Sequence, residues 1–254
     1  MVRPLLKSLV LTVAALGAVL LPAAAGSKRG AEPGAPRDAA TRDGKEDNRY
    51  QKVRRDSVSP SDVKTRYSGL TEEDFHLVSK ELGVEAAAIK AVVQIEAGSQ
   101  MRGFWAPGVP VVNFQPTMFG RYRTKVASKG APDEKVPSGL SGFALREWSQ
   151  LVNARRKNVD AANLSAFWGM FQIGGFNYRK CGCETIEEFV QLMSHSELEQ
   201  LELFAAFITN TGMLADLKAK NWAAFALKYN GSSYRRRGYH TKMAAAYNKF
   251  RNQK

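Results

Sequence analysis

The sequence contains few residues of the types that form disulfides or bind metals, with two Cys and three His among 254 residues. Cys181 and Cys183 are one residue apart, and a disulfide across that spacing would close a small strained ring. His76, His195 and His240 show no metal-ligand spacing. We therefore expect two unbridged structural thiols, with a metal site as the lesser alternative, and no cofactor.

The chain also lacks several motifs that identify common enzyme classes. No internal repeat occurs, and neither GxGxxG nor GxxxxGK[ST] is present. No Ser lies in the context of a nucleophile elbow. These absences argue against nucleotide-binding folds of the Rossmann and P-loop types and against a serine hydrolase.

The longest apolar run lies at the N-terminus, at residues 8–21, after Arg3 and Lys7 and before the small residues that end at Ala25. This order is typical of a secretory signal peptide, and the run is short for a membrane span. We expect residues 1–25 to be removed, leaving no transmembrane segment. No Cys is available there for a lipid, so we expect a soluble exported protein, periplasmic or extracellular.

Residues 26–66 are rich in Gly, Pro, Ser and charged residues and have almost no large apolar side chains. Such a segment cannot bury enough surface to offset chain entropy, which predicts a disordered basic linker. Residues 67–254 are long enough for one domain with its own core. The expected organisation is therefore a signal peptide (1–25), a linker (26–66) and a single globular domain (67–254).

The chain is basic, with 37 Lys and Arg against 24 Asp and Glu and a net charge of +13. The folded domain remains basic without the first 66 residues, and a positive field attracts polyanions. Export makes nucleic acid an unexpected partner, so we expect cell-wall polymers and a monomeric protein.

Periodicity and capping residues predict a mainly α domain with one small strand region. Residues 166–175 are apolar and broken by glycines, which favours a buried irregular turn, and 125–142 are expected to form a surface loop. The strand is expected at 111–114, and the helices at 71–83, 85–96, 119–125, 143–156, 185–193, 196–211, 213–218, 221–229 and 241–250.

Glu96 ends one of these helices, and Ile89, Val92 and Val93 share its helical face. Burial on an apolar face raises the pKa of a carboxyl group and favours its protonated form. A carboxylic acid kept protonated near neutral pH is what a general acid requires. The alternative is a carboxylate at a frayed helix end that faces water.

Three motifs, taken in order, resemble the lysozyme-like superfamily, and most closely its bacterial and phage N-acetylmuramidase domain. They are Ile-Glu-Ala-Gly-Ser at 95–99, Phe-Trp-Gly-Met-Phe-Gln-Ile-Gly-Gly-Phe-Asn at 167–177, and Lys-Tyr-Asn-Gly at 228–231. The likeness extends from about Leu70 to Tyr247. It implies a lysozyme-like globular fold and an endolysin-type enzyme that cleaves the glycan strands of peptidoglycan.

The resemblance implies that Glu96 protonates the β-1,4 glycosidic oxygen between N-acetylmuramic acid and N-acetylglucosamine. Gln172, Tyr229 and Asn230 would then line the cleft and hold the sugar or the acid. Trp168, Trp105 and Tyr234 would offer flat faces to sugar rings. Each has a structural alternative, since Trp168 suits a core, Gln172 suits buried backbone groups, and Tyr229 suits helix packing.

The sequence departs from the family pattern at Gln115, where the family commonly has Glu, although Gln115 still suits substrate binding. Many glycosidases use two carboxylates, and the remaining candidate for positioning a water is Asp160. A mechanism with one acid is the alternative.

We expect a hydrolase, namely a muramidase. A lytic transglycosylase that leaves anhydro-muramic ends and a peptidoglycan-binding protein without catalysis are the other two possibilities. Arg235, Arg236 and Arg237 would either contact the anionic wall or form a solvated loop.

Overall fold

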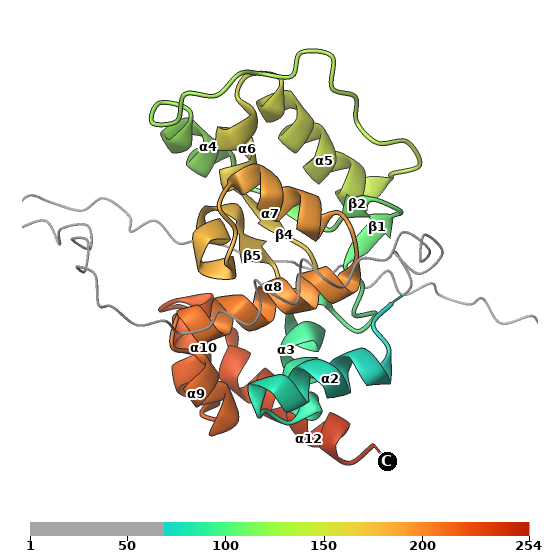
Figure 1. The fold of residues 1–254 in the computed structure, drawn as a ribbon, viewed down its shortest axis with the longest axis vertical. Helices are drawn as coiled ribbons and strands as arrows, with labels where there is room; N and C mark the ends of the chain where they lie inside the picture. Colours follow the sequence, from blue (N-terminus) through green and yellow to red (C-terminus); the bar gives the residue numbers. More distant parts are fainter. Residues whose placement is uncertain (1–68, 254) are drawn as a thin grey trace, which may run out of the picture.

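The computed structural model describes residues 69–253, so the expected signal peptide (1–25) and linker (26–66) lie outside the described residues. The described part is mostly helical with two small antiparallel sheets (Figure 1), which confirms the mainly α prediction. None of its helices is both long and apolar enough to span a membrane. The helices are α2 (Glu72–Leu82), α3 (Ala86–Ala97), α4 (Pro116–Tyr122), α5 (Gly142–Arg155), α6 (Val159–Leu164), η2 (Gly175–Cys181, a 3₁₀ helix), α7 (Ile186–Met193), α8 (Glu197–Asn210), α9 (Leu214–Lys218), α10 (Trp222–Asn230), α11 (Tyr234–Arg237) and α12 (Tyr239–Arg251). The strands are β1 (Phe104–Ala106), β2 (Val109–Pro110), β3 (Val112–Phe114), β4 (Ala166–Trp168) and β5 (Ile173–Gly174).

The first described helix, α2, begins and ends where its capping residues predict. Thr71 and Asp74 form a reciprocal capping box, in which the Thr71 hydroxyl accepts from the Asp74 N–H at 3.2 Å. Gly83 ends the helix in the left-handed conformation at φ +62°. These local bonds direct the chain into α3.

Helix α3 lies in the core of the domain, and α12 packs along it. Ile89, Ala91, Val92 and Val93 are all 0% exposed. Burial of each large aliphatic side chain contributes roughly 1.5–3 kcal/mol. The position of α3, and of Glu96 near its end, is therefore fixed by packing rather than by surface contacts.

The strands form one two-stranded sheet, β1–β2, and one three-stranded sheet in the order β3–β4–β5. Residues 166–175, expected to be an irregular turn, instead contain the antiparallel hairpin β4–β5, with Phe167 opposite Gly174. Its loop starts at Gly169, which has φ +68° and where an added Cβ would lie 2.6 Å from the Gln200 amide oxygen. The glycines thus permit a tight hairpin.

Other differences from the expected elements concern short helices and strands. The helix expected at 119–125 begins earlier, at Pro116, because proline suits the first turn of a helix. The same helix ends at Tyr122, three residues before the expected end, and residues 125–141 contain neither helix nor strand, as expected. The helices α6, α11 and η2 and the strands β1 and β2 were not predicted, since each is short.

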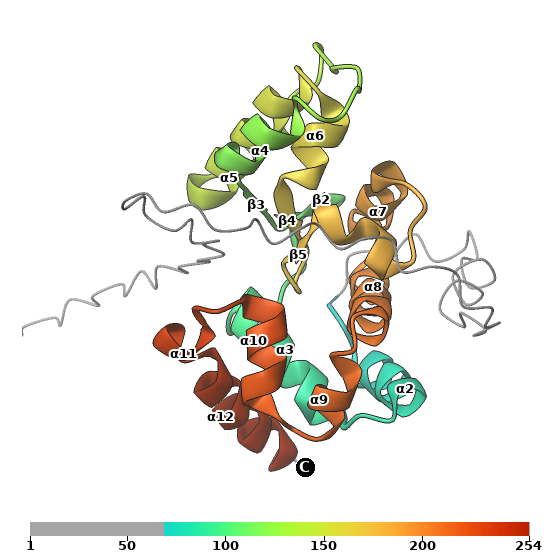
Figure 2. The same ribbon diagram turned by 90° about the vertical axis from the view of Figure 1, so that its left-hand side faces the viewer.

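Figure 2 shows α4–α6 at one end of the molecule and α3 with α10–α12 at the other, with β5 and α8 between them. The hairpin end of the larger sheet therefore lies near the helices that carry Glu96 and Asn230.

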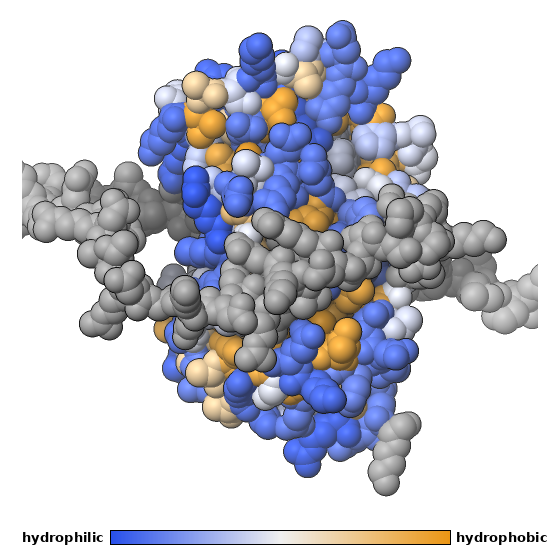
Figure 3. Space-filling model, viewed as in Figure 1, coloured by the Kyte–Doolittle hydropathy of each residue, from blue (hydrophilic) through white to orange (hydrophobic). Residues whose placement is uncertain are grey.

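Most of the described surface facing the viewer in Figure 3 is hydrophilic.

Gln200 of α8 links the loop of the β4–β5 hairpin to the end of α7 by hydrogen bonds. Its side chain is 0% exposed, its amide oxygen accepts from the Met170 N–H at 2.8 Å, and its amide nitrogen donates to the Met193 carbonyl at 2.8 Å. A buried backbone group that loses its partner costs about 1–3 kcal/mol.

We expect Gln200→Ala to lower the free energy of unfolding by about 3 kcal/mol, because it leaves a cavity and unpaired backbone groups. Urea denaturation measures this change. Gln191→Ala, at an exposed position of α7, is the matched control and is expected to change stability by less than about 0.5 kcal/mol. A similar small effect at Gln200 would contradict its structural role.

Candidate active site

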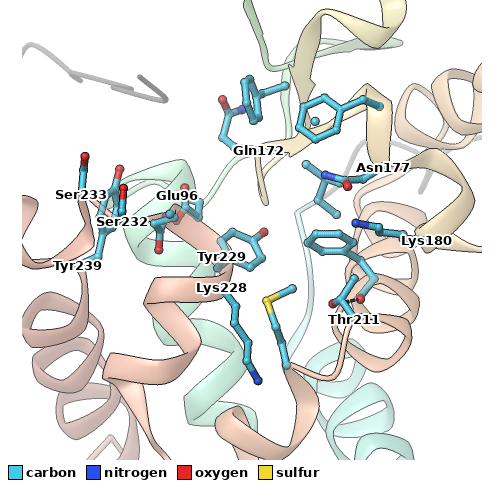
Figure 4. A pocket seen from close by; sticks show the side chains of 18 of the residues that line it. Glu96, Gln172, Asn177, Lys180, Thr211, Lys228, Tyr229, Ser232, Ser233 and Tyr239 are labelled. Carbon is cyan, nitrogen blue, oxygen red and sulfur yellow. Dashed lines mark hydrogen bonds between the residues drawn. The ribbon is translucent and has the colours of Figure 1, made fainter. Parts of the chain in front are cut away.

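A cleft of about 580 Å³ opens between the β4–β5 hairpin, η2 and the C-terminal helices. In Figure 4, Glu96, Ser232, Ser233 and Tyr239 lie on one side of Tyr229, and Asn177, Lys180 and Thr211 lie on the other. The lining residues are Glu96, Phe167, Gln172, Ile173, Gly174, Phe176, Asn177, Lys180, Phe207, Thr211, Met213, Lys228, Tyr229, Asn230, Gly231, Ser232, Ser233, Arg237 and Tyr239.

Glu96 enters the cleft from the last turn of α3. The helix ends at Ala97, and Gly98 then turns the chain away at φ +78°. One face of the preceding turns of α3 is buried, whereas Glu96 itself is half-buried and lines the cleft. The frayed, solvent-facing alternative is therefore wrong for this carboxyl group.

Asn230, the last residue of α10, contacts Glu96 directly. Its side-chain amide nitrogen donates to Glu96 Oε1 at 2.8 Å. Gly231 follows at φ +77° and ends the helix there. Among the described residues, the buried Asn230 Oδ1 has no hydrogen-bond partner. The bond joins the ends of two helices that are 134 residues apart in sequence.

Burial raises the pKa of the Glu96 carboxyl from 4.5 to about 7, against the opposing effect of the hydrogen bond from Asn230. Burial, and next the charge of Glu96, also raise the pKa of Tyr229 and of Tyr239. At neutral pH a large fraction of Glu96 is protonated and both phenols remain neutral. The site thus presents a carboxylic acid that can donate a proton.

Tyr229 holds the hairpin loop against α10, and Gln172 closes the loop on itself. The Tyr229 hydroxyl donates to the Phe171 carbonyl at 2.6 Å, and its ring stacks on Phe225 at 5.4 Å. Gln172 has φ +48°, and its amide nitrogen donates to the Gly169 carbonyl at 2.8 Å. The structure therefore brings together four residues singled out from the sequence, Glu96, Gln172, Tyr229 and Asn230.

Two aromatic residues expected to be sugar platforms lie in the core instead. Trp168 is 0% exposed, and its indole N–H donates to the Asn163 carbonyl at 3.0 Å. Tyr234 is 6% exposed and packs edge-on against His240 at 5.4 Å. The interpretation of both as sugar-stacking residues is wrong, because neither ring presents a face to the cleft.

Gln115 and Asp160 do not line the cleft. Gln115 donates from its side chain to Asn113 Oδ1 at 2.7 Å. Asp160 lies in the first turn of α6, where its N–H donates to the Ser128 hydroxyl at 3.3 Å. The structure gives neither residue a place beside Glu96.

Glu96 is the only acidic residue among those that line the cleft within residues 69–253. Two other buried carboxylates support the backbone elsewhere. Glu147 accepts from the Phe114 N–H at 2.9 Å, and Glu197 accepts from the Gly103 N–H at 2.6 Å. A second catalytic carboxylate is therefore not present in the described cleft.

The sequence interpretation missed an aromatic pair in the cleft wall. Phe176 of η2 is 39% exposed and meets Phe167 edge-to-face at 6.0 Å. Gly174 makes room for it, since an added Cβ there would lie 2.3 Å from the Phe176 ring. The Gly-Gly-Phe sequence at 174–176 was the available signal.

The arginines at 235–237 and the two cysteines differ in whether they reach the cleft. Arg237 lines the cleft, whereas the Arg235 guanidinium donates to the Tyr234 hydroxyl at 2.8 Å. Cys181 and Cys183 are both buried. Within the described residues no group of three or more His, Cys, Asp or Glu is placed to hold a metal ion.

Comparisons with known proteins agree with this geometry. The family model described as N-acetylmuramidase matches residues 85–251. The crystal structure of the Burkholderia AP3 phage endolysin is similar to this chain, with 32% sequence identity and a TM-score of 0.59 over 72% of this chain and 71% of the endolysin chain. A comparison with curated proteins gave no match.

The raised pKa of Glu96 makes the stability of the domain depend on pH. Between pH 4.5 and about 7 the folded state binds more protons at this group than the unfolded state, so the free energy of unfolding falls as pH rises. We expect Glu96→Gln to be more stable than the wild type by about 3 kcal/mol at pH 8 and nearly equal to it at pH 4.

Urea denaturation at both pH values measures the difference. Glu81→Gln, at an exposed position of α2, controls for the loss of one carboxylate. A stability gain from Glu96→Gln that is the same at pH 4 and pH 8 would argue against a desolvated carboxyl.

Proposed function

This chain belongs to the N-acetylmuramidase family and is a peptidoglycan-degrading enzyme, and we propose that it hydrolyses the β-1,4 bond between N-acetylmuramic acid and N-acetylglucosamine with Glu96 as the general acid. The observation that carries this proposal is a half-buried carboxyl group that lines the cleft and accepts a hydrogen bond from Asn230, and burial raises its pKa to about 7. Proton donation by a positioned acid typically contributes a factor of 10²–10⁴ to the rate.

In the first step, the Glu96 carboxyl protonates the glycosidic oxygen, and the bond to C1 of N-acetylmuramic acid breaks. Asn230 donates to Glu96 Oε1, which leaves Oε2 as the oxygen that carries the proton. The same hydrogen bond stabilises the carboxylate that forms when the proton leaves. Burial therefore keeps the acid protonated before the step, and Asn230 assists its ionisation during the step.

In the second step, the Glu96 carboxylate takes a proton from the water that attacks C1, which regenerates the acid and leaves a reducing end. The hydroxyl groups of Ser232, Ser233 and Tyr239, which line the cleft on the same side of Tyr229 as Glu96 in Figure 4, are suited to hold this water. One acid suffices for this sequence of steps, in keeping with the absence of a second carboxylate from the described lining.

The same lone carboxylate also favours a second candidate, a lytic transglycosylase. There the Glu96 carboxylate would deprotonate the C6 hydroxyl of N-acetylmuramic acid, which would close a 1,6-anhydro ring and release no reducing end. The two reactions share the first step and differ in their product, so product chemistry separates them.

The remaining cleft residues supply contacts for the glycan. Phe176 and Phe167 offer the exposed aromatic surface that the sequence interpretation assigned to Trp168, and apolar and aromatic walls with a few polar groups are typical of ligand sites. Gln172 offers an amide at the hairpin loop. We further propose that residues 67–254 act on the wall outside the cytoplasm as a monomer, after removal of residues 1–25, with 26–66 as a linker.

Incubation of the mature protein with purified sacculi, followed by mass spectrometry, tests the reaction. We expect soluble fragments that end in reducing N-acetylmuramic acid, and Glu96→Gln is expected to lower their release about 100- to 10,000-fold because it removes the donated proton. Glu81→Gln is the matched control and should retain wild-type release. Anhydro ends would show that the reaction is transglycosylation and not hydrolysis. Wild-type release by Glu96→Gln would show that Glu96 is not the general acid.

We expect Asn230 to affect how the rate of the reaction depends on pH. A general acid works in its protonated form, so the rate is expected to fall as pH rises through about 7. Asn230→Ala removes the interaction that lowers the pKa of Glu96. It should therefore move this alkaline limb to higher pH and reduce the maximal rate by about tenfold.

Rate profiles of the two proteins between pH 5 and 9 give the comparison. Asn177→Ala is a suitable control, because Asn177 lines the cleft at the end away from Glu96. An alkaline limb that stays in place in Asn230→Ala would separate this residue from the ionisation of Glu96.

A further inference from the structure

The cleft continues beyond the acid to a second region lined by η2. Phe176, Asn177 and Lys180 of this short helix all line the cleft. In Figure 4 the Lys180 ammonium points into the cavity, on the opposite side of Tyr229 from Glu96. A substrate that reaches Glu96 and fills the cleft therefore also meets a positive charge at this end.

The three cations that line the cleft differ in their protein partners. The Lys228 ammonium binds Asp216 Oδ2 at 2.6 Å and the Gly212 carbonyl at 3.2 Å. The Arg237 guanidinium forms a hydrogen bond with the Tyr239 side chain. Within residues 69–253, no hydrogen bond or ion pair engages the Lys180 ammonium. Lys180 is thus the cleft cation that is available to a ligand.

The surroundings of Lys180 suit a short acidic peptide. Phe207 and Met213 add apolar surface to the lining of the same cleft, and Asn177, which lies at the Lys180 end in Figure 4, adds an amide. Glu96 is the only carboxyl group among the described residues that line the cleft, and it is protonated for much of the time at neutral pH. An incoming carboxylate would therefore meet a cation and an apolar wall without a competing negative charge in the lining.

We propose that Lys180 binds a carboxylate of the stem peptide that N-acetylmuramic acid carries on its lactyl group. This proposal rests on the proposed cleavage at N-acetylmuramic acid, because the peptide then extends from the same sugar whose C1 lies at Glu96. Lys180 is accordingly a specificity-determining residue that makes the enzyme favour glycan whose peptides keep their acidic groups. A partly exposed ion pair of this kind is worth about a fivefold change in rate.

A cycle that combines a mutation with a chemical change of the substrate tests this contact. Wild type and Lys180→Met are each assayed on native sacculi and on sacculi whose peptide carboxylates have been converted to amides. On native sacculi Lys180→Met is expected to lower kcat/KM about fivefold, and on amidated sacculi its effect should be much smaller. Such coupling arises when the altered groups interact and not when they act independently.

Two further variants separate the contact from a general effect of charge. Lys180→Arg keeps the cation and is expected to retain most of the preference for native sacculi. Lys125→Met removes one charge from an exposed position outside the cleft, and its effect on rate should be equal on the two substrates if it has any.

Equal losses on both substrates in Lys180→Met, or no loss on either, would overturn the proposal. Both outcomes are distinct from a failure of the proposed function, because wild-type release of reducing N-acetylmuramic acid from native sacculi is measured in the same assay.

Discussion

The burial of one carboxyl group at the end of an apolar helix is the constraint on which the site depends. Packing of α3 in the core fixes Glu96 at the wall of the cleft, where it is half-buried, and this desolvation raises its pKa to about 7. The hydrogen bond from Asn230 opposes that shift and keeps the pKa within reach of neutral pH. Movement of α10 away from α3 would admit water and remove the bond, so the proposed acid catalysis requires these two helix ends to stay together.

That requirement explains the arrangement of the neighbouring polar bonds. Tyr229 precedes Asn230 on α10, and its hydroxyl donates to the Phe171 carbonyl in the hairpin loop. Gln200 holds the same loop through the Met170 N–H. A chain of buried contacts thus links α8, the hairpin and α10 to the acid. Segments distant in sequence form one wall because each supplies the partner that another lacks.

The elements that the sequence could predict are those set by local rules. The helix at 71–83, the apolar stripe of α3 and the position of Glu96 follow from periodicity and capping residues, and the resemblance added Gln172, Tyr229 and Asn230. Trp168 and Tyr234 were misassigned because their burial depends on contacts such as the Trp168–Asn163 bond and the Tyr234–His240 packing. The position of the Phe176 ring likewise depends on the absence of a side chain at Gly174, and a periodic pattern in the sequence does not reveal this contact.

The distribution of charge in the cleft separates two tasks that otherwise conflict. A cation close to Glu96 would favour the carboxylate and lower its pKa, which would weaken the acid. Yet a basic cleft attracts an anionic wall polymer. Burial raises the pKa of Glu96 and the Asn230 bond lowers it, while Lys180, Lys228 and Arg237 line the same cleft. In Figure 4, Lys180 lies on the opposite side of Tyr229 from Glu96, so the proposed contact of Lys180 with the substrate is separated from the proposed acid.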